Sequence, residues 1–214
     1  MSVAKAIKYR RSMQEFDQTK KISNENLNSI LNAGRLAPSA LGVESTRVIV
    51  VRDPEIKAEI AKYAFQELNH KKVLTADSLV LFASRKGKHF QNRDFLTKRL
   101  QKWNLSEQDL AFRVEAYYNY LDNVSLGPDV YSANQAYIAM SYMSLQAADL
   151  GIDSVIMQGF DFDKLNQILV DKGYIDGEVE SVYISLGLGH VTEAIRKNLY
   201  QRVLMNLDEY STII

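Results

Sequence analysis

Cysteine is absent from this chain of 214 residues. Without thiols the protein can form no disulfide, no thiolate metal site and no cysteine nucleophile. Histidine is scarce as well: His70, His89 and His190 lie far apart, and none has the spacing of a metal-ligand pair. The two shortages together argue against metal chemistry and thiol chemistry.

The chain also lacks an excess of charge and a long apolar run. Lys and Arg total 26, and Asp and Glu total 26, so the formal net charge is zero. A nucleic-acid-binding domain usually carries a basic surface, which this balance argues against. No run of about 18 uncharged apolar residues is present to span a membrane, and residues 1–12 lack the apolar core of a signal peptide. We therefore expect a cytoplasmic protein without nucleic-acid or membrane partners.

What is present fits one globular domain with few strands. Hydrophobic residues make up 46% of the chain and charged residues 24%, as in ordinary globular proteins large enough to bury a core. β-Branched runs predict strands at residues 47–52, 78–84 and 179–186, and residues 153–157 form a short strand or an extended link. Few strands among many helices, without a regular βαβ repeat, favour an α+β fold over a doubly wound sheet.

Helical periodicity covers most of the remaining chain. The expected helices span residues 2–9, 23–35, 54–63, 131–150 and 161–169. A charged and helical segment rich in aromatic residues runs from 86 to about 123, and Gly127-Pro128 ends it. Residues 65–72 are polar and favour no single structure. Because no linker or repeat is visible, we expect a single domain over residues 1–214, with residues 86–128 as a helical excursion.

One apolar stretch, residues 131–160, is expected to organise the fold. Its helical part is apolar on nearly every side and rich in alanine, which predicts a helix buried on most sides with close neighbours. The stretch ends in Met157-Gln158-Gly159, where a flat group could approach the glycine backbone. On these residues alone, a core element is favoured over a binding site.

Arg10-Arg11-Ser12 is the first candidate site. Two guanidinium groups and a hydroxyl on a turn could hold a phosphate, because Arg forms forked, charge-assisted hydrogen bonds. The alternative is that cations at the end of a helix are simply solvated and favoured by the helix dipole. A second basic group, Arg196-Lys197 with Arg202, could join the same phosphate if the two ends of the chain meet.

Asn69 and Lys72 are a second candidate pair. Their three-residue spacing places them on one face of a helical turn, where an amide and an ammonium could meet the polar edge of a heterocycle. A solvated turn is the alternative. By contrast, Gly187-Leu188-Gly189 is not a dinucleotide-binding loop, because it follows the last expected strand and no third glycine opens a helix.

These segments occur in an order that resembles the nitroreductase family of FMN-dependent NAD(P)H oxidoreductases. The similar segments are AIKYRRSMQEFD, LAPSALGVES, RVIVVRDP, NHKKVLTADSLVLF and QAYIAMSYMSLQAADLGIDSVIMQGFD. The resemblance covers nearly the whole chain and is weakest over residues 86–128 and in the C-terminal tail. It implies a mainly antiparallel sheet between helices and an intertwined homodimer with two identical sites at the interface.

The resemblance also implies which residues meet each part of FMN. Arg10, Arg11 and Ser12 would hold the phosphate, together with a C-terminal cation, either Lys197 or Arg202. The isoalloxazine ring would contact Asn69, Lys72, Met157, Gln158 and Gly159. The second subunit would contribute Pro38, Ser39, Ala40, Leu41 and Gly42. Lys72 would be catalytic, as a fixed cation where negative charge develops on the reduced flavin.

The implied function is ping-pong hydride transfer from NADH or NADPH, through FMN, to a nitroaromatic, quinone or flavin acceptor. Aromatic residues of the 86–123 segment would line the mouth of the site. Three departures from the family pattern are Gln158 where many members have Glu, Gln14 where a basic residue is common, and Thr46 where an aromatic residue is common. The alternatives are a specialised flavoenzyme of the same fold, such as a dehalogenase or an azoline-type oxidase, and a non-catalytic flavin-binding dimer.

Overall fold

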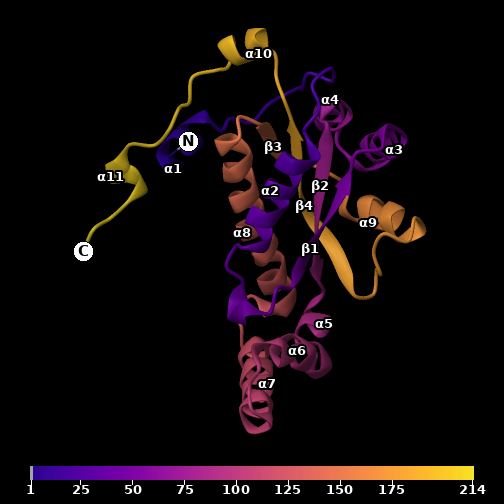
Figure 1. The fold of residues 1–214 in the computed structure, drawn as a ribbon, viewed down its shortest axis with the longest axis vertical. Coiled ribbons are helices and arrows are strands. Elements are labelled where there is room, and N and C mark those ends of the chain that lie inside the picture. The colour runs from indigo at the N-terminus through magenta and orange to yellow at the C-terminus, as the bar shows by residue number, and fades with distance from the viewer. Residues whose placement is uncertain (1) are drawn as a thin grey trace.

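The computed structural model describes residues 2–214, and one antiparallel sheet lies at its centre (Figure 1). The sheet is formed by β1 (Thr46–Val51), β2 (Ser78–Arg85), β3 (Asp153–Met157) and β4 (Glu180–Gly189). The spatial order is β1-β2-β4-β3, and each neighbouring pair is antiparallel. The expected α+β fold with a mainly antiparallel sheet between helices is confirmed.

Helices cover both faces of this sheet. In chain order they are α1 (Val3–Tyr9), α2 (Asn24–Arg35), α3 (Pro54–Ala64), α4 (Glu67–Thr75), α5 (Gly87–Phe90), α6 (Arg93–Leu100), α7 (Glu107–Asp122), α8 (Gly127–Asp149), α9 (Phe162–Asp171), α10 (Glu193–Lys197) and α11 (Leu207–Tyr210), with short 3-10 turns η1 (Ala40–Gly42) and η2 (Gln101–Trp103). In Figure 1, α2 and α8 lie on one side of the sheet, and α3 and α9 lie on the other.

The alternation of side chains along β2 explains the two layers of helices. Leu79 and Leu81 belong to the core shared with α3, α4 and α9, whereas Val80 and Phe82 belong to the core shared with α2 and α8. Successive side chains of a strand point to opposite faces. Because Ser78–Ser84 are all buried, the strand needs cover on both sides, and the two layers of helices provide it.

The expected excursion folds around a small core of its own. Helices α5, α6 and α7 project from the lower end of the sheet in Figure 1, away from α1 and α10. Their core contains Val43, Phe90, Leu96, Leu100, Val114 and Leu121. Val43 is the one member of this list that precedes β1, so the segment leading into the sheet is packed against the excursion.

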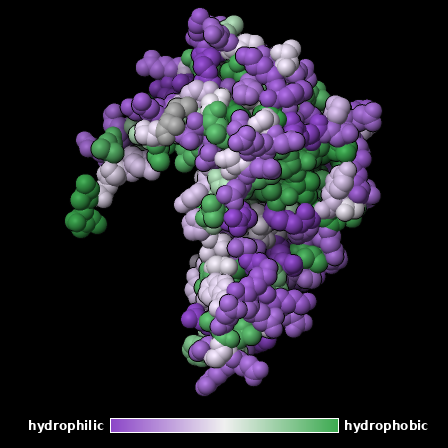
Figure 2. Space-filling model, in the orientation of Figure 1, coloured by the Kyte–Doolittle hydropathy of each residue, from purple (hydrophilic) through white to green (hydrophobic). Residues whose placement is uncertain are grey.

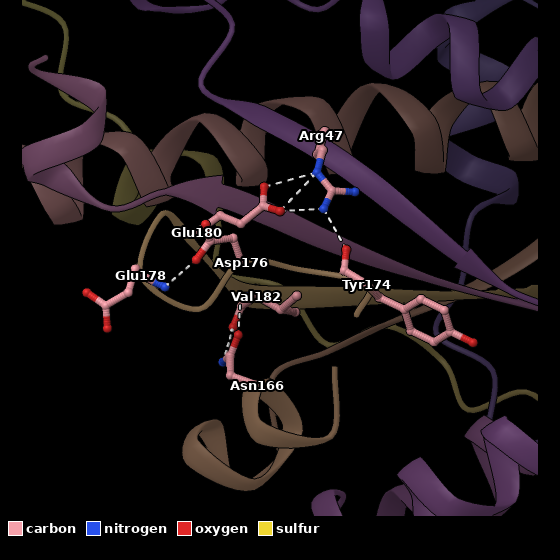
Figure 3. Close-up of polar contacts among 7 residues, drawn as sticks. All are labelled: Arg47, Asn166, Tyr174, Asp176, Glu178, Glu180 and Val182. Carbon is pink, nitrogen blue, oxygen red and sulfur yellow. Dashed lines mark hydrogen bonds and ion pairs between the residues drawn. The ribbon is translucent and has the colours of Figure 1, made fainter. Parts of the chain in front are cut away.

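Polar contacts fasten the end of the sheet that faces the excursion (Figure 3). Arg47 of β1 forms an ion pair with Glu180 of β4 and donates to the carbonyl of Tyr174 at 2.7 Å. Asn166 of α9 accepts a hydrogen bond from the N–H of Val182 at 2.7 Å. Since β2 lies between β1 and β4, the Arg47 side chain reaches across it and fixes the position where β1 begins.

The C-terminal tail leaves the body of the molecule (Figure 1). After α10 it is irregular apart from α11, and its far end is coloured as hydrophobic in Figure 2. Its exposed apolar side chains are Tyr200, Val203, Leu204, Met205, Leu207, Tyr210, Ile213 and Ile214. Within residues 2–214, no helix has the length and apolarity required to cross a membrane.

The structure differs from the sequence expectations in three places. Residues 67–75, which overlap the segment without a clear preference, form helix α4. Gly127-Pro128 ends the preceding segment and also opens α8. Proline is suited to the start of a helix, because its missing N–H would have no partner there. Gly187-Leu188-Gly189 lies within β4 rather than after it.

Candidate active site

Met157-Gln158-Gly159 ends β3 and turns toward α4. The carbonyl of Gly159 accepts hydrogen bonds from the N–H of Gln66 and from Nδ2 of Asn69, both at 3.0 Å. A Cβ on Gly159 would lie 2.6 Å from Asn69 Nδ2 and 3.0 Å from Gln66 Oε1. Close packing with α4 therefore leaves no space for a side chain at residue 159 unless Asn69 and Gln66 move.

Asn69 and Lys72 lie on one face of α4, as their spacing predicts. Lys72 Nζ donates to Asn69 Oδ1 at 2.8 Å, while the other end of the same amide binds Gly159. Both ends of the Asn69 amide are thus occupied, which orients the side chain. The result is a half-buried ammonium group fixed beside the glycine turn.

The side chain of Gln158 points to the long helix. Its Nε2 donates to the hydroxyl of Tyr137 on α8 at 2.6 Å. Burial raises the pKa of the Tyr137 hydroxyl. Ser185 Oγ of β4 donates to the carbonyl of Met157 at 2.9 Å. The turn is therefore held on both sides, by α8 and by β4.

A cationic cavity of about 760 Å³ lies where the two ends of the chain meet. It is lined by Arg10, Arg11, Ser12, Gln14, Glu15, Ala194, Ile195, Asn198, Leu199, Tyr200, Arg202 and Leu204. Burial, followed by the charges of Arg202 and Arg11, lowers the pKa of Arg10. Three cations gathered at one cavity repel each other, and an anion bound among them would relieve that repulsion.

The C-terminal cations separate into different roles. Arg202 donates to the carbonyls of Arg10 and Ile7, so it belongs to the cavity. Arg196 is instead paired with the buried carboxylate of Asp153. Lys197 is mostly exposed, lies 3.7 Å from Glu193 and is not among the residues that line the cavity. Of the two expected C-terminal candidates, the structure brings Arg202 to the arginine turn and leaves Lys197 outside.

The cavity and the glycine turn are neighbours along β3. Ser12 forms a bridge with Ser154 of that strand, and the Ser154 hydroxyl is buried without a hydrogen-bond partner. Met157 follows three residues later, about 10 Å along the strand. One elongated ligand with an anionic end can therefore contact both the arginine cavity and the glycine turn of the same subunit.

Residues 38–42 lie at the opposite end of the sheet. Ser154 pairs with Leu188 beside Ser78, whereas the 38–42 loop leads into Thr46, which pairs with Ser84. Ser78 and Ser84 are six positions apart along β2, which corresponds to roughly 20 Å. Within one chain, the expected flavin loop does not meet the other expected flavin residues.

Sequence reasoning missed two polar residues of this site. Gln66 donates to the Gly159 carbonyl from the position before α4, and Tyr137 holds Gln158. Gln66 lies three residues before Asn69, a spacing that could have been noticed. Nothing in the sequence near Tyr137 distinguishes it from a core residue of an apolar helix. In the part of the chain that the structure describes, no group of three or more His, Cys, Asp or Glu could hold a metal ion.

Comparisons with known proteins identify the family of this chain. The model of the Nitroreductase family matches residues 7–189. A protein of Staphylococcus epidermidis that is provisionally named an NAD(P)H nitroreductase is 33% identical over 195 residues, covering 88% of this chain and 87% of the relative.

Two solved structures have the same fold over their whole length. An enone reductase of gut-bacterial fatty acid saturation metabolism has a TM-score of 0.82 and 20% identity, covering 100% of this chain and 98% of the other. A provisional nitroreductase of Exiguobacterium sibiricum, in complex with FMN, has a TM-score of 0.80 and 20% identity, with the same coverage. Together with the family model, the sequence relative establishes what the motifs predicted: this chain belongs to the nitroreductase family.

Proposed function

We propose that the chain is an FMN-dependent oxidoreductase that transfers a hydride from NADH or NADPH to an electron acceptor in two half-reactions. The observation that carries this proposal is the short distance along β3, about 10 Å, between the Ser12 end of the arginine cavity and the Gly159 turn, where the Lys72 ammonium is fixed. The names of the sequence relatives support the nicotinamide donor. The FMN-bound structures of the same fold support the cofactor.

The residues present fit FMN on three observations. Arg10, Arg11 and Arg202 surround a cavity that favours an anion, which suits the phosphate. The Ser154 hydroxyl is buried without a partner beside Ser12, although it can form hydrogen bonds. The absence of a side chain at Gly159 lets Asn69 and Gln66 pack directly on the turn, so that their amides lie beside the backbone that would meet the ring.

FMN would supply the redox chemistry, accepting two electrons and a proton as hydride and passing electrons on. The chain's own part is to bind and orient. Arg10, Arg11, Ser12 and Arg202 hold the anionic end, and the Met157–Gly159 turn meets the ring. Lys72, fixed by Asn69, supplies a positive charge where negative charge develops, and this charge needs no reorganisation during the reaction.

Lys72→Ala is expected to lower the reduction potential of the bound flavin. Loss of one fixed cation should shift the potential by roughly 30 mV or more, equivalent to about 1.4 kcal/mol for a two-electron couple. The measurement is a spectroelectrochemical titration of the purified protein. Lys164→Ala is the matched control, because this exposed lysine follows the turn but is paired with Asp161. An unchanged potential in Lys72→Ala would remove the electrostatic role of Lys72.

We also propose that the active form is a homodimer, in which each 38–42 loop serves the flavin site of the partner. Three features support this arrangement. An apolar cavity of about 460 Å³ between α2 and α8 is lined in part by Pro38, Ser39 and Met143. Strand β1 is an edge strand whose exposed backbone groups can pair with another chain, and the tail beyond α10 presents apolar side chains.

The dimer should dissociate more readily when the tail is shortened. Deleting residues 203–214 keeps Arg202 but removes most of the exposed apolar tail, so the monomer fraction should rise at low protein concentration. Light scattering coupled to size-exclusion chromatography measures this fraction. Tyr63→Ala, on α3 at the opposite face of the sheet, should leave the dimer unchanged. A full-length protein that is monomeric at all concentrations would refute the homodimer.

We propose that the excursion lies at the mouth of the partner's site, where its aromatic residues select among nitroaromatic, quinone and flavin acceptors. The reaction itself is tested by adding NADH or NADPH to the purified protein without oxygen. Bleaching of a yellow flavin spectrum, followed by recovery on addition of one of these acceptors, is the expected result. A yellow protein that does not bleach would favour a non-catalytic flavin-binding role. A colourless protein that does not bind added FMN would refute the cofactor assignment.

A further inference from the structure

The loop from Pro38 to Glu44, called the flavin loop below, is packed against the excursion more than against the sheet. Val43 is fully buried in the small core of the excursion, beside Phe90 and Leu96, and Leu41 packs on the same core. The loop therefore takes its position from helices that belong to a different part of the sequence.

The backbone of the flavin loop is strained. Leu41, Gly42 and Glu44 have positive φ values of 55°, 66° and 50°. For the two residues that carry a side chain this left-handed conformation costs on the order of 1 kcal/mol or more, and it persists only where the surroundings enforce it. The contacts that enforce it can be identified individually.

Trp103, in η2 at the end of α6, lies directly on the loop. A Cβ built on Gly42 would be 2.7 Å from Cζ2 of Trp103 and 3.1 Å from its Cη2, so the indole ring packs against the Gly42 backbone. Trp103 is 43% exposed. One part of the ring therefore supports the loop while the rest remains free at the surface.

Two polar contacts hold the loop beside this indole. Arg99 of α6 forms an ion pair with Glu44. Gln135 of α8 accepts a hydrogen bond from the N–H of Ala40 at 2.8 Å and donates to the carbonyl of Tyr131 at 2.9 Å. The two ends of the loop are thus tied, and Gly42 between them rests on the indole.

We propose that Trp103 is a positioning residue that fixes the flavin loop in the shape with which it meets the cofactor of the partner subunit. The part of this statement that concerns FMN rests on the proposed function. The part that concerns the loop rests on the geometry alone. Trp103 acts through the loop backbone, since no side chain of Gly42 intervenes.

Hydrogen–deuterium exchange in the protein as purified tests the loop directly. In Trp103→Ala, amides of residues 39–45 should exchange about tenfold faster than in the wild type, because the enforcing contact is removed. Trp103→Phe keeps a flat ring on Gly42 and should restore slow exchange to within about threefold. Tyr63→Ala, an exposed aromatic on α3 at 55% exposure, is the control and should exchange as the wild type does.

The effect on the cofactor is measured by titrating FMN into the flavin-free protein and recording flavin fluorescence. We expect a Kd about tenfold higher in Trp103→Ala and near the wild-type value in Trp103→Phe. Unchanged loop exchange in Trp103→Ala overturns the proposal, as does faster exchange spread evenly over the whole chain. Faster loop exchange with an unchanged Kd refutes the link to FMN. A wild-type protein that binds no FMN refutes the proposed function, while the exchange data still decide the role of Trp103.

Discussion

Gly159→Ala should weaken FMN retention roughly 10- to 100-fold, the equivalent of an overpacking cost of about 1–3 kcal/mol. The added methyl group would lie 2.6 Å from Asn69 Nδ2. Asn69 cannot move aside freely, because its amide already binds the Gly159 carbonyl and Lys72. The methyl group must therefore displace either the turn or Asn69, which orients Lys72. Flavin content after purification and the rate of anaerobic bleaching measure both effects.

A double-variant cycle separates this mechanism from general damage to the fold. If the methyl group acts by displacing Asn69, then Gly159→Ala combined with Asn69→Ala should lose little beyond Asn69→Ala alone. Additive losses would mean that Gly159→Ala acts on the turn by another route. Thermal unfolding of the three proteins shows whether the core between β3 and α4 stays intact.

The fold was largely predictable because its signals are local. Runs of β-branched residues with buried faces mark β1, β2 and β4, and the caps Ser23, Asp53 and Ser106 are observed where helices α2, α3 and α7 begin. The segment that became α4 carries no such signal. Its helix has a weakly apolar face with one buried residue, Val73, so tertiary contacts with the Gly159 turn decide its structure.

The site was predictable where one short segment carries the chemistry. Spacing marks Arg10-Arg11-Ser12 and the Asn69–Lys72 pair as candidates but leaves a solvated turn open for each, and the family resemblance supplies their expected roles. Contacts between distant segments were not predictable. Which C-terminal cation reaches the arginine turn depends on the path of the tail, and the support of Gly42 by Trp103 joins residues 61 positions apart. No local pattern records such a contact.

The site has two parts, and different contacts hold each of them in place. The cation cavity and the Gly159 turn are joined through β3, which is rigid and buried. The flavin loop depends instead on the excursion, whose core is small and separate from the sheet. Variation in the excursion can therefore act on the flavin through this loop, while the phosphate end of the site is left unchanged. The phosphate end should respond to charge alone.

Arg10→Ala should raise the Kd for FMN about 30-fold, since a charge-assisted hydrogen bond to a phosphate contributes roughly 2 kcal/mol. Riboflavin, which has the same ring and no phosphate, should bind the variant and the wild type alike. The preference for FMN over riboflavin should thus fall by the same factor, as measured by fluorescence titration of the flavin-free proteins. The matched control is Lys197→Ala. Lys197 is also a cation near the C-terminus, but it is paired with Glu193 and does not line the cavity.

The outcomes distinguish the phosphate assignment from a role of Arg10 in the fold. Arg10 is half-buried and its pKa is lowered by burial and by Arg202 and Arg11. Removing it without an anion present relieves repulsion, so the flavin-free variant should unfold at the same temperature as the wild type or higher. FMN should then stabilise the wild type more than the variant. If riboflavin binding weakens as much as FMN binding, Arg10 shapes the cavity rather than holding the phosphate. If the binding of neither flavin changes, the anionic end does not contact Arg10, and Arg202 with Arg11 would have to hold it.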